Sequence, residues 1–255
     1  MLKFAANLTM LFTERPLLQR FEAAAQAGFT GVEVLFPYDL AAKELVQATR
    51  ANGLQSVLLN APPPSWTGGA RGFAADPALV DRFRADFDRA LRFGRALGTE
   101  HIHIMSGVAE GAAARETLIG NLAWATARAP QTSLTIEPLN GTDMPGYFLN
   151  DFDLAAEIIA AVGAPNLGLQ FDSYHAHRIS GDVGACWQRH RALVRHVQIG
   201  GAPTRCEPDK GENDHAAFLK QLLADNYTGW VSAEYKPAGT TEAGLGWLGK
   251  ANRAR

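Results

Sequence analysis

Four polar side chains follow short apolar runs of the sequence, and their types could support metal chemistry. Glu137 ends the run Ser-Leu-Thr-Ile-Glu, Asp172 ends Leu-Gly-Leu-Gln-Phe-Asp, and Glu234 ends Trp-Val-Ser-Ala-Glu. Gln198 lies in His-Val-Gln-Ile, which is followed by two glycines. Pro138 comes directly after Glu137, and proline cannot donate to a sheet ladder, so a strand must finish there. An acid at the end of a buried strand is costly unless something pairs with it.

If these side chains meet in space, their oxygen atoms can bind a divalent cation. Three carboxylates in one dry site repel one another, and a cation removes that repulsion. Ligand sets made only of oxygen favour Mg²⁺ or Mn²⁺ over zinc. The alternative is that each acid caps the next helix or pairs with a nearby arginine. That explanation suits a single acid, but four equivalent positions favour a metal site at Glu137, Asp172, Gln198 and Glu234.

The elements that must position these side chains alternate between short apolar strands and helices. We expect strands that end near residues 8, 36, 59, 105, 137, 172, 198 and 234. We expect helices at residues 16–27, 41–52, 78–97, 113–129, 151–162, 181–193, 214–224 and 241–252. Such runs are typical of parallel strands that are buried on both faces. Eight units in 255 residues favour an α/β fold with a single (β/α)8 TIM barrel as one domain over residues 1–255, rather than an open sheet.

A barrel of this kind brings the four polar side chains together. The carboxyl ends of its strands open on one face, where active sites lie. The four side chains belong to the last four strands, which are neighbours around the ring. His175 follows Asp172 by three residues and can face the same site. His103 and His196 lie within expected strands, and we interpret them as hydrogen-bonded interior histidines.

Composition limits the partners of the chain. Hydrophobic residues make up 47% of the sequence, which is enough for a sizeable core. The formal net charge of −2 gives no general reason to bind nucleic acid. No apolar stretch approaches the length of a membrane span. The two cysteines, Cys186 and Cys206, cannot form a disulfide framework, so we expect a reducing compartment, the cytoplasm. A homo-oligomer is compatible with these data.

Nine runs of the sequence form a pattern that covers nearly the whole chain. They are residues 4–8, 31–38, 65–72, 136–140, 143–150, 172–175, 196–199, 205–208 and 234–237. In these runs the chain resembles the hydroxypyruvate isomerase family, including the 2-oxo-tetronate isomerases, within the xylose isomerase-like TIM barrels. The resemblance implies that Glu137, Asp172, Gln198 and Glu234 bind a divalent metal. It also implies that Glu137 and Glu234 act as catalytic acid and base.

The expected reaction moves a carbonyl between adjacent carbons of a small anionic acid, either hydroxypyruvate, which gives tartronate semialdehyde, or a 2-oxo-tetronate. Proton transfer through an enediolate would use the two glutamates, and a hydride shift would use the same ligands. His175, Arg205 and Lys236 are the candidates for binding the substrate, because a cation can hold its carboxylate. Trp66 and Arg71 lie in a long loop that could close over it. Surface ion pairs are the alternative role for Arg205 and Lys236.

Three places differ from the family pattern near the expected mouth of the barrel: Thr142, His177 and residues 211–215. They leave the proposed metal chemistry unaffected and bear on the choice of substrate. Three other functions therefore stay open. One is a ketose 3-epimerase that acts on a neutral sugar, and another is a nucleic-acid enzyme on the same barrel. The third is a binding protein in which a metal is only structural.

Overall fold

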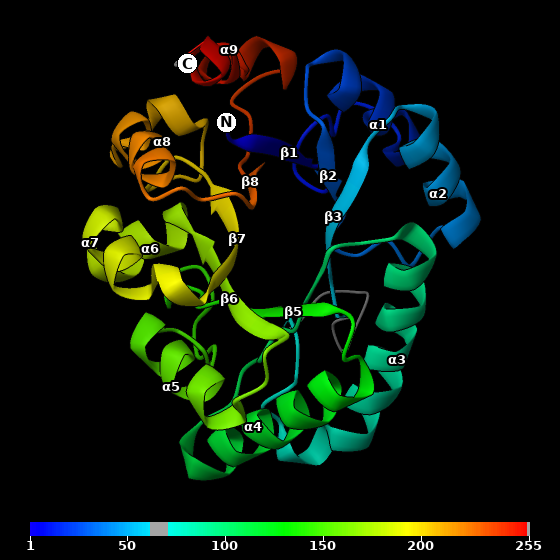
Figure 1. The fold of residues 1–255 in the computed structure, drawn as a ribbon, viewed down its shortest axis with the longest axis vertical. Coiled ribbons are helices and arrows are strands. Elements are labelled where there is room, and N and C mark those ends of the chain that lie inside the picture. Colours follow the sequence, from blue (N-terminus) through cyan, green and yellow to red (C-terminus); the bar gives the residue numbers. More distant parts are fainter. Residues whose placement is uncertain (62–70, 254–255) are drawn as a thin grey trace.

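The computed structural model describes residues 1–61 and 71–253 and contains a closed barrel of parallel strands (Figure 1). The predicted (β/α)8 fold is confirmed. The strands follow one another around the ring in sequence order, and β1 closes it by pairing with β8. They are β1 Lys3–Asn7, β2 Gly31–Glu33, β3 Gln55–Asn60, β4 His101–His103, β5 Ser133–Ile136, β6 Leu167–Asp172, β7 Val194–Ile199 and β8 Trp230–Ala233.

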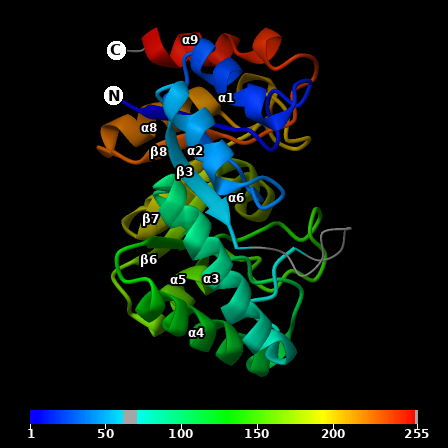
Figure 2. The ribbon, with the colours of Figure 1, turned by 90° about the vertical axis from the view of Figure 1, so that its right-hand side faces the viewer.

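Helices surround the barrel and cover the outer faces of its strands (Figure 1). They are α1 Leu17–Gln26, α2 Ala42–Ala51, α3 Val80–Leu97, α4 Gly111–Arg128, α5 Phe152–Val162, α6 Ser173–Ser180, α7 Val183–His190, α8 His215–Ala224 and α9 Gly246–Arg253. Every residue of β6 is buried, as expected for a strand with the barrel interior on one side and helices on the other. The N-terminus lies beside α8 and α9 (Figures 1 and 2). Within the described ranges, no helix is long and apolar enough to cross a membrane.

One helix that matters for the site was not predicted from the sequence. The predicted helix at residues 181–193 is present as α7 and the 3₁₀ turn Arg191–Leu193, but a separate helix, α6, precedes it and begins at Ser173, directly after β6. Asp172 caps it, because its side chain accepts a hydrogen bond of 2.9 Å from the backbone N–H of Tyr174. Gly181, with a φ of 76°, ends α6 instead of starting a helix. His175 therefore lies in the first turn of α6.

Two strands are shorter than predicted. The sequence indicated strands up to residues 36 and 105, whereas β2 ends at Glu33 and β4 at His103. Pairing between β2 and β3 shifts its register between Val32 and Glu33, and such an irregularity interrupts a ladder. At the end of the chain, the expected helix at 241–252 is divided into a 3₁₀ turn, Glu242–Gly244, and α9.

Candidate active site

The four strand-end side chains are all buried at the carboxyl end of the barrel strands. Glu137 follows the last residue of β5, and Glu234 follows the last residue of β8. Asp172 is the last residue of β6, and Gln198 is the fifth of the six residues in β7. All four have at most 6% of their surface exposed. Carboxylates this deeply buried require partners, because burial of an unpaired charge is costly.

Two shared donors connect the four side chains in pairs. The side-chain amide nitrogen of Gln170 donates to Glu137 Oε2 at 2.9 Å and to Gln198 Oε1 at 2.7 Å. The Nη2 atom of Arg205 lies 2.8 Å from Asp172 Oδ2 and 3.1 Å from Glu234 Oε2. Each pair of acceptors is therefore within a few ångströms of its shared nitrogen.

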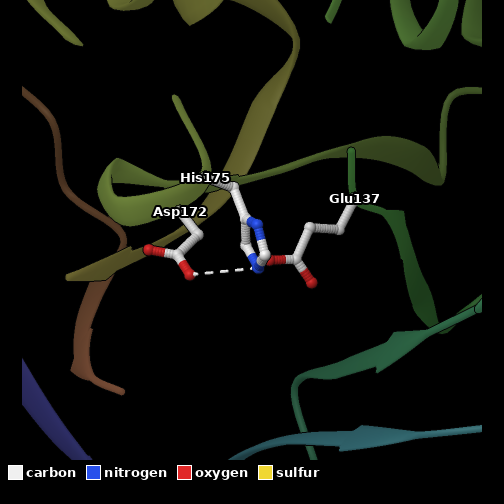
Figure 3. A group of neighbouring side chains, drawn as sticks. All are labelled: Glu137, Asp172 and His175. Carbon is white, nitrogen blue, oxygen red and sulfur yellow. Dashed lines mark ion pairs between the residues drawn. The ribbon is translucent and has the colours of Figure 1, made fainter. Parts of the chain in front are cut away.

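A group of three residues joins the two pairs. It consists of Glu137 from the first pair, Asp172 from the second pair, and His175. Each offers a nitrogen or oxygen atom, and the three atoms lie within 4.8 Å of one another. Figure 3 shows the three side chains pointing toward one another, with the imidazole of His175 beside both carboxylates. His175 Nε2 lies 3.8 Å from Asp172 Oδ2. By distance alone, this group could hold a metal ion through two carboxylates and one imidazole.

The hydrogen bonds of His175 argue against its being a metal ligand. Its Nδ1 atom faces the backbone N–H of Asn140 at 3.0 Å and the side-chain amide nitrogen of Asn140 at 2.9 Å. The orientation of that amide is determined by its oxygen, which accepts from the backbone N–H groups of Thr142 and Asp143. Nδ1 must therefore accept, and the neutral ring carries its proton on Nε2. An N–H group donates hydrogen bonds but cannot coordinate a cation.

The electrostatic environment opposes ionisation of the carboxylates. Burial is the main cause that raises the pKa of Glu137 well above its usual range, and the charges of Glu234 and Asp172 add to it. Burial also raises the pKa of Glu234 to about 8, although Arg205 acts in the opposite direction. The pKa of Asp172 is raised by burial despite Arg205. Burial by itself would lower the pKa of Arg205, but Glu234 and Asp172 outweigh that effect and raise it.

The residues present fit a hard divalent cation. Glu137 Oε1 is buried and has no hydrogen-bond partner among the described residues, so it has a lone pair to offer. The neighbouring acceptors are carboxylate and amide oxygens, the ligand types that Mg²⁺ and Mn²⁺ prefer. When all three are ionised, Glu137, Asp172 and Glu234 carry three negative charges against the single positive charge of Arg205. A divalent cation would balance that excess.

The predicted substrate-binding residues are distributed between the site and its rim. Arg205 has a left-handed backbone with a φ of 56°, and its guanidinium packs 4.9 Å above the ring of Tyr174. Arg71 is exposed, and its positive charge lowers the pKa of Glu234, in opposition to the larger effect of burial. The side chain of Lys236 is exposed, and its backbone N–H donates to the carbonyl of Arg205 at 2.7 Å. Trp66 lies outside the described residues, as do all of residues 62–70 of the long loop.

The two interior histidines have partners inside the barrel, in agreement with the sequence interpretation. His103 Nδ1 lies 3.2 Å from Asn60 Oδ1, and His196 Nε2 forms a very short contact with Glu33 Oε1. Three polar residues of the site were not selected from the sequence: Glu33, Asn140 and Gln170. An acid or amide in an otherwise apolar strand was a usable signal for Glu33 and Gln170. For Asn140 the only signal was its position after the end of β5.

Comparison with known proteins identifies the family. The profile of the family described as the xylose isomerase-like TIM barrel matches residues 21–251. The chain belongs to this family. It is 45% identical over 252 residues to 2-oxo-tetronate isomerase from Cupriavidus necator, which covers 96% of this chain and 97% of that relative. It is also 40% identical to hydroxypyruvate isomerase from Escherichia coli, with 97% and 98% of the two chains covered.

Solved structures agree with the family assignment. A crystal structure of an AP endonuclease, family 2, from Brucella melitensis has a TM-score of 0.95 and 41% identity, and covers 98% of this chain and 99% of that one. D-psicose 3-epimerase from Clostridium cellulolyticum H10 has a TM-score of 0.78 at 18% identity, with 100% and 93% covered, which shows a shared fold alone. Together with the relatives above, the family assignment makes this chain an isomerase of the hydroxypyruvate isomerase type.

Proposed function

We propose that this isomerase interconverts the carbonyl isomers of a small anionic hydroxy-keto acid, either hydroxypyruvate and tartronate semialdehyde or a 2-oxo-tetronate and its isomer. Relatives with these two names are 39–45% identical to the chain over nearly its full length. The observation that carries the proposal is the pair of buried glutamates, Glu137 and Glu234. The pKa values of both glutamates are raised. Glu137 follows β5 and Glu234 follows β8, which are the first and the last of the four strands that carry the proposed ligands. The small anionic acid is the only partner that the proposal requires.

Glu137, Asp172, Gln198 and Glu234 would hold the divalent metal, Mg²⁺ or Mn²⁺. When bound, such an ion polarises a carbonyl as a Lewis acid and stabilises negative charge on the adjacent oxygen atoms. The other groups of the chain bind the substrate and move its protons. Because the site is buried, the interactions of those groups with a reacting molecule are stronger than they would be in water.

The two glutamates perform the proton transfers in this proposal. For hydroxypyruvate, one carboxylate removes a proton from C3, which leaves a planar enediolate. The other glutamic acid delivers a proton to C2 on the way to tartronate semialdehyde, while the hydroxyl proton moves from the oxygen on C3 to the oxygen on C2. A raised pKa suits both roles, because a general acid or base works best near the operating pH. A hydride shift between C3 and C2 is the alternative route through the same residues.

Arg205 and His175 are the groups proposed to bind the polar ends of the substrate. The guanidinium of Arg205 offers paired N–H donors to a carboxylate. The Nε2–H of His175 faces the same space. It lies 3.2 Å from Arg205 Nη1, and because both groups are donors in this tautomer, the two do not hydrogen-bond to each other and can both point to an acceptor on the substrate. Lys236, Arg71 and Trp66 are proposed to contribute at the mouth. The two free cysteines agree with the proposed cytoplasmic location.

A substrate panel tests the proposal. The protein is assayed with Mg²⁺ or Mn²⁺ on hydroxypyruvate, a 2-oxo-tetronate, fructose and tagatose, and products are followed by NMR. We expect turnover of hydroxypyruvate or the 2-oxo-tetronate. That turnover should be lost when the metal is removed with a chelator, and it should recover when the metal is added back. In D₂O, proton transfer introduces solvent deuterium at C2, whereas a hydride shift does not. Turnover of the neutral ketoses alone would replace this proposal with a ketose 3-epimerase.

A further inference from the structure

Glu33 is a fully buried carboxylate next to the proposed ligands, and no step described above uses it. It is the last residue of β2, and none of its surface is exposed. Its Oε2 atom accepts from the side-chain amide of Asn7 at 3.1 Å and from Nε2 of Gln198 at 3.0 Å. Its Oε1 atom contacts His196 Nε2. The carboxylate thus connects β1, β2 and β7 in the barrel interior.

The contact with Glu33 determines which end of the Gln198 amide faces the cluster. A carboxylate can only accept hydrogen bonds, so the amide must present its NH₂ group to Glu33. Its oxygen then lies on the opposite side, where it accepts from Gln170 at 2.7 Å. If the amide of Gln198 were flipped by 180°, its oxygen would face the carboxylate oxygen of Glu33, and its NH₂ group would face the NH₂ group of Gln170. Neither pair could form a hydrogen bond.

Gln170 is oriented independently of Glu33, and its orientation agrees. Its side-chain amide faces Oε2 of Glu137 at 2.9 Å, and an ionised carboxylate can only accept, while its own oxygen accepts from the hydroxyl of Thr135 at 3.1 Å. Its NH₂ group must therefore face Glu137 and Gln198, and it needs the oxygen of Gln198 as acceptor. The two amides and Glu33 form one buried chain of hydrogen bonds in which every direction is determined. Buried networks of this kind impose a single arrangement because a mismatched polar group is costly.

We propose that Glu33 is a positioning residue that makes Gln198 an oxygen ligand. An amide that is free to turn would present its NH₂ group to a cation for part of the time, and a donor repels a cation. Glu33 removes that orientation, so that Gln198 Oε1 is directed toward the side occupied by Glu137. The inference rests on the metal site in the proposed function. It assigns a role to a residue that contacts neither the cation nor the substrate.

The competing explanation is that Glu33 only holds the strands together. A double-mutant cycle of Mn²⁺ affinity, measured by calorimetry, separates the two roles. Glu33→Gln should weaken Mn²⁺ binding by roughly 10–100-fold, the range found for partners of metal ligands. In the Gln198→Glu background, the same change should strengthen binding, because the new amide at position 33 donates to the new carboxylate at position 198. A purely structural role predicts weaker binding in both backgrounds.

Asn7→Ala is the matched control. It removes another donor to the same oxygen of Glu33 but leaves the contact between Glu33 and Gln198 in place. We expect its melting temperature to fall while its Mn²⁺ dissociation constant stays within about threefold of wild type, well inside the effect expected at Glu33. Equal losses of affinity in Asn7→Ala and Glu33→Gln would overturn the positioning role.

A crystal structure of the Mn²⁺-loaded wild type tests the inference even if Glu33→Gln does not fold. Coordination through the Gln198 oxygen, with its amide nitrogen still against Glu33, supports the inference, and an amide turned away from Glu33 overturns it. A wild-type protein that binds no Mn²⁺ would remove the metal site and this inference together. Wild-type affinity in Glu33→Gln would overturn the inference alone. Because binding is measured without substrate, failure of the substrate panel leaves these readouts intact.

Discussion

The backbone N–H of Asn140 donates to Nδ1 of His175 at 3.0 Å. A backbone N–H can only donate, so this bond leaves Nε2 to carry the proton of the neutral ring. Burial lowers the pKa of His175 well below its usual range, and the charge of Arg205 lowers it further. His175 is therefore a neutral hydrogen-bond donor at pH 7, and this state leads to two predictions.

The first prediction concerns the protonation state of His175. In ¹⁵N NMR of the metal-free protein, we expect a neutral ring with the proton on Nε2 from pH 6 to pH 8. No titration near the ordinary histidine pKa of about 6.5 should occur, because burial and Arg205 both oppose the charged form. A proton on Nδ1, or a charged ring at pH 6, would contradict the hydrogen-bond assignment.

The second prediction separates a ligand from a substrate donor. His175→Ala should change the Mn²⁺ dissociation constant by less than about threefold, because the ring does not coordinate the ion. Its kcat/KM for the acid substrate should fall by about 10–200-fold, equivalent to about 1.4–3 kcal/mol for the loss of a hydrogen bond to a charged group. Asp172→Asn is the positive control for loss of metal. If His175→Ala loses metal as severely as Asp172→Asn, His175 is a ligand and the tautomer argument is wrong.

The third prediction concerns the catalytic glutamates. Glu137→Gln and Glu234→Gln keep the shape of the side chain but remove its ability to transfer a proton. Each substitution should lower kcat by about 10²–10⁴-fold, the usual contribution of general acid–base catalysis. Circular dichroism and Mn²⁺ occupancy at saturating metal must be measured in parallel, since loss of the ion would mimic loss of the acid or base. A metal-saturated variant with near-wild-type turnover would eliminate that residue as acid or base.

The fourth prediction concerns recognition of the substrate carboxylate. Arg205→Ala should reduce kcat/KM for hydroxypyruvate or a 2-oxo-tetronate. The loss of transition-state stabilisation should be about 2–5 kcal/mol, the scale for truncating a buried charged contact. Arg205→Lys should recover only part of this loss, because an ammonium group lacks the planar fork of a guanidinium. Arg178, whose guanidinium donates to the Pro203 carbonyl at 3.4 Å, is a matched control nearby. Similar losses in Arg178→Ala and Arg205→Ala would show that general charge, and not Arg205 itself, selects the substrate.

The fifth prediction is the pH dependence of stability without metal. The folded-state pKa of Glu234 is raised to about 8, and that of Glu137 is raised well above its usual range. Between the unfolded pKa of about 4.3 and these values, the folded state binds more protons than the unfolded state. These two glutamates should therefore lower the free energy of unfolding as pH rises, by up to about 1.4 kcal/mol per pH unit for each group. The effect should be visible above pH 7, because below it the buried histidines with lowered pKa values, such as His101, His103 and His215, contribute a slope of the opposite sign.

Chemical denaturation at pH 7.0, 7.5 and 8.0, with chelator present, measures this slope. Mn²⁺ should restore stability most at pH 8.0, because its carboxylate ligands must lose their protons to bind it. Glu234→Gln is the matched control, since its side chain does not titrate and the slope should become smaller. Stability that rises from pH 7 to pH 8 in the chelated protein would contradict the raised pKa values of the two glutamates.

The sequence by itself determined the order of the elements and the positions of the proposed ligands. Apolar runs that end in an acid, a proline or a glycine are local signals, because burial and the missing N–H of proline act on a few adjacent residues. They were sufficient to place Glu137, Asp172 and Glu234 at or next to strand ends. They failed at α6, where Asp172 accepts from the backbone N–H of Tyr174, although the sequence pattern favoured a ligand role for Asp172 over a capping role.

Only the tertiary structure decided which atoms of these residues face one another. Glu33 contacts Gln198 across 165 positions of the chain, and no local signal reports a partner so distant. Closure of the barrel brings β2 beside β1 and places β7 and β8 on the other side of β1. The same closure brings Arg205 between Asp172 and Glu234. Hydrogen-bond direction and charge pairing depend on these long-range contacts, whereas strand and helix formation depend mainly on neighbouring residues.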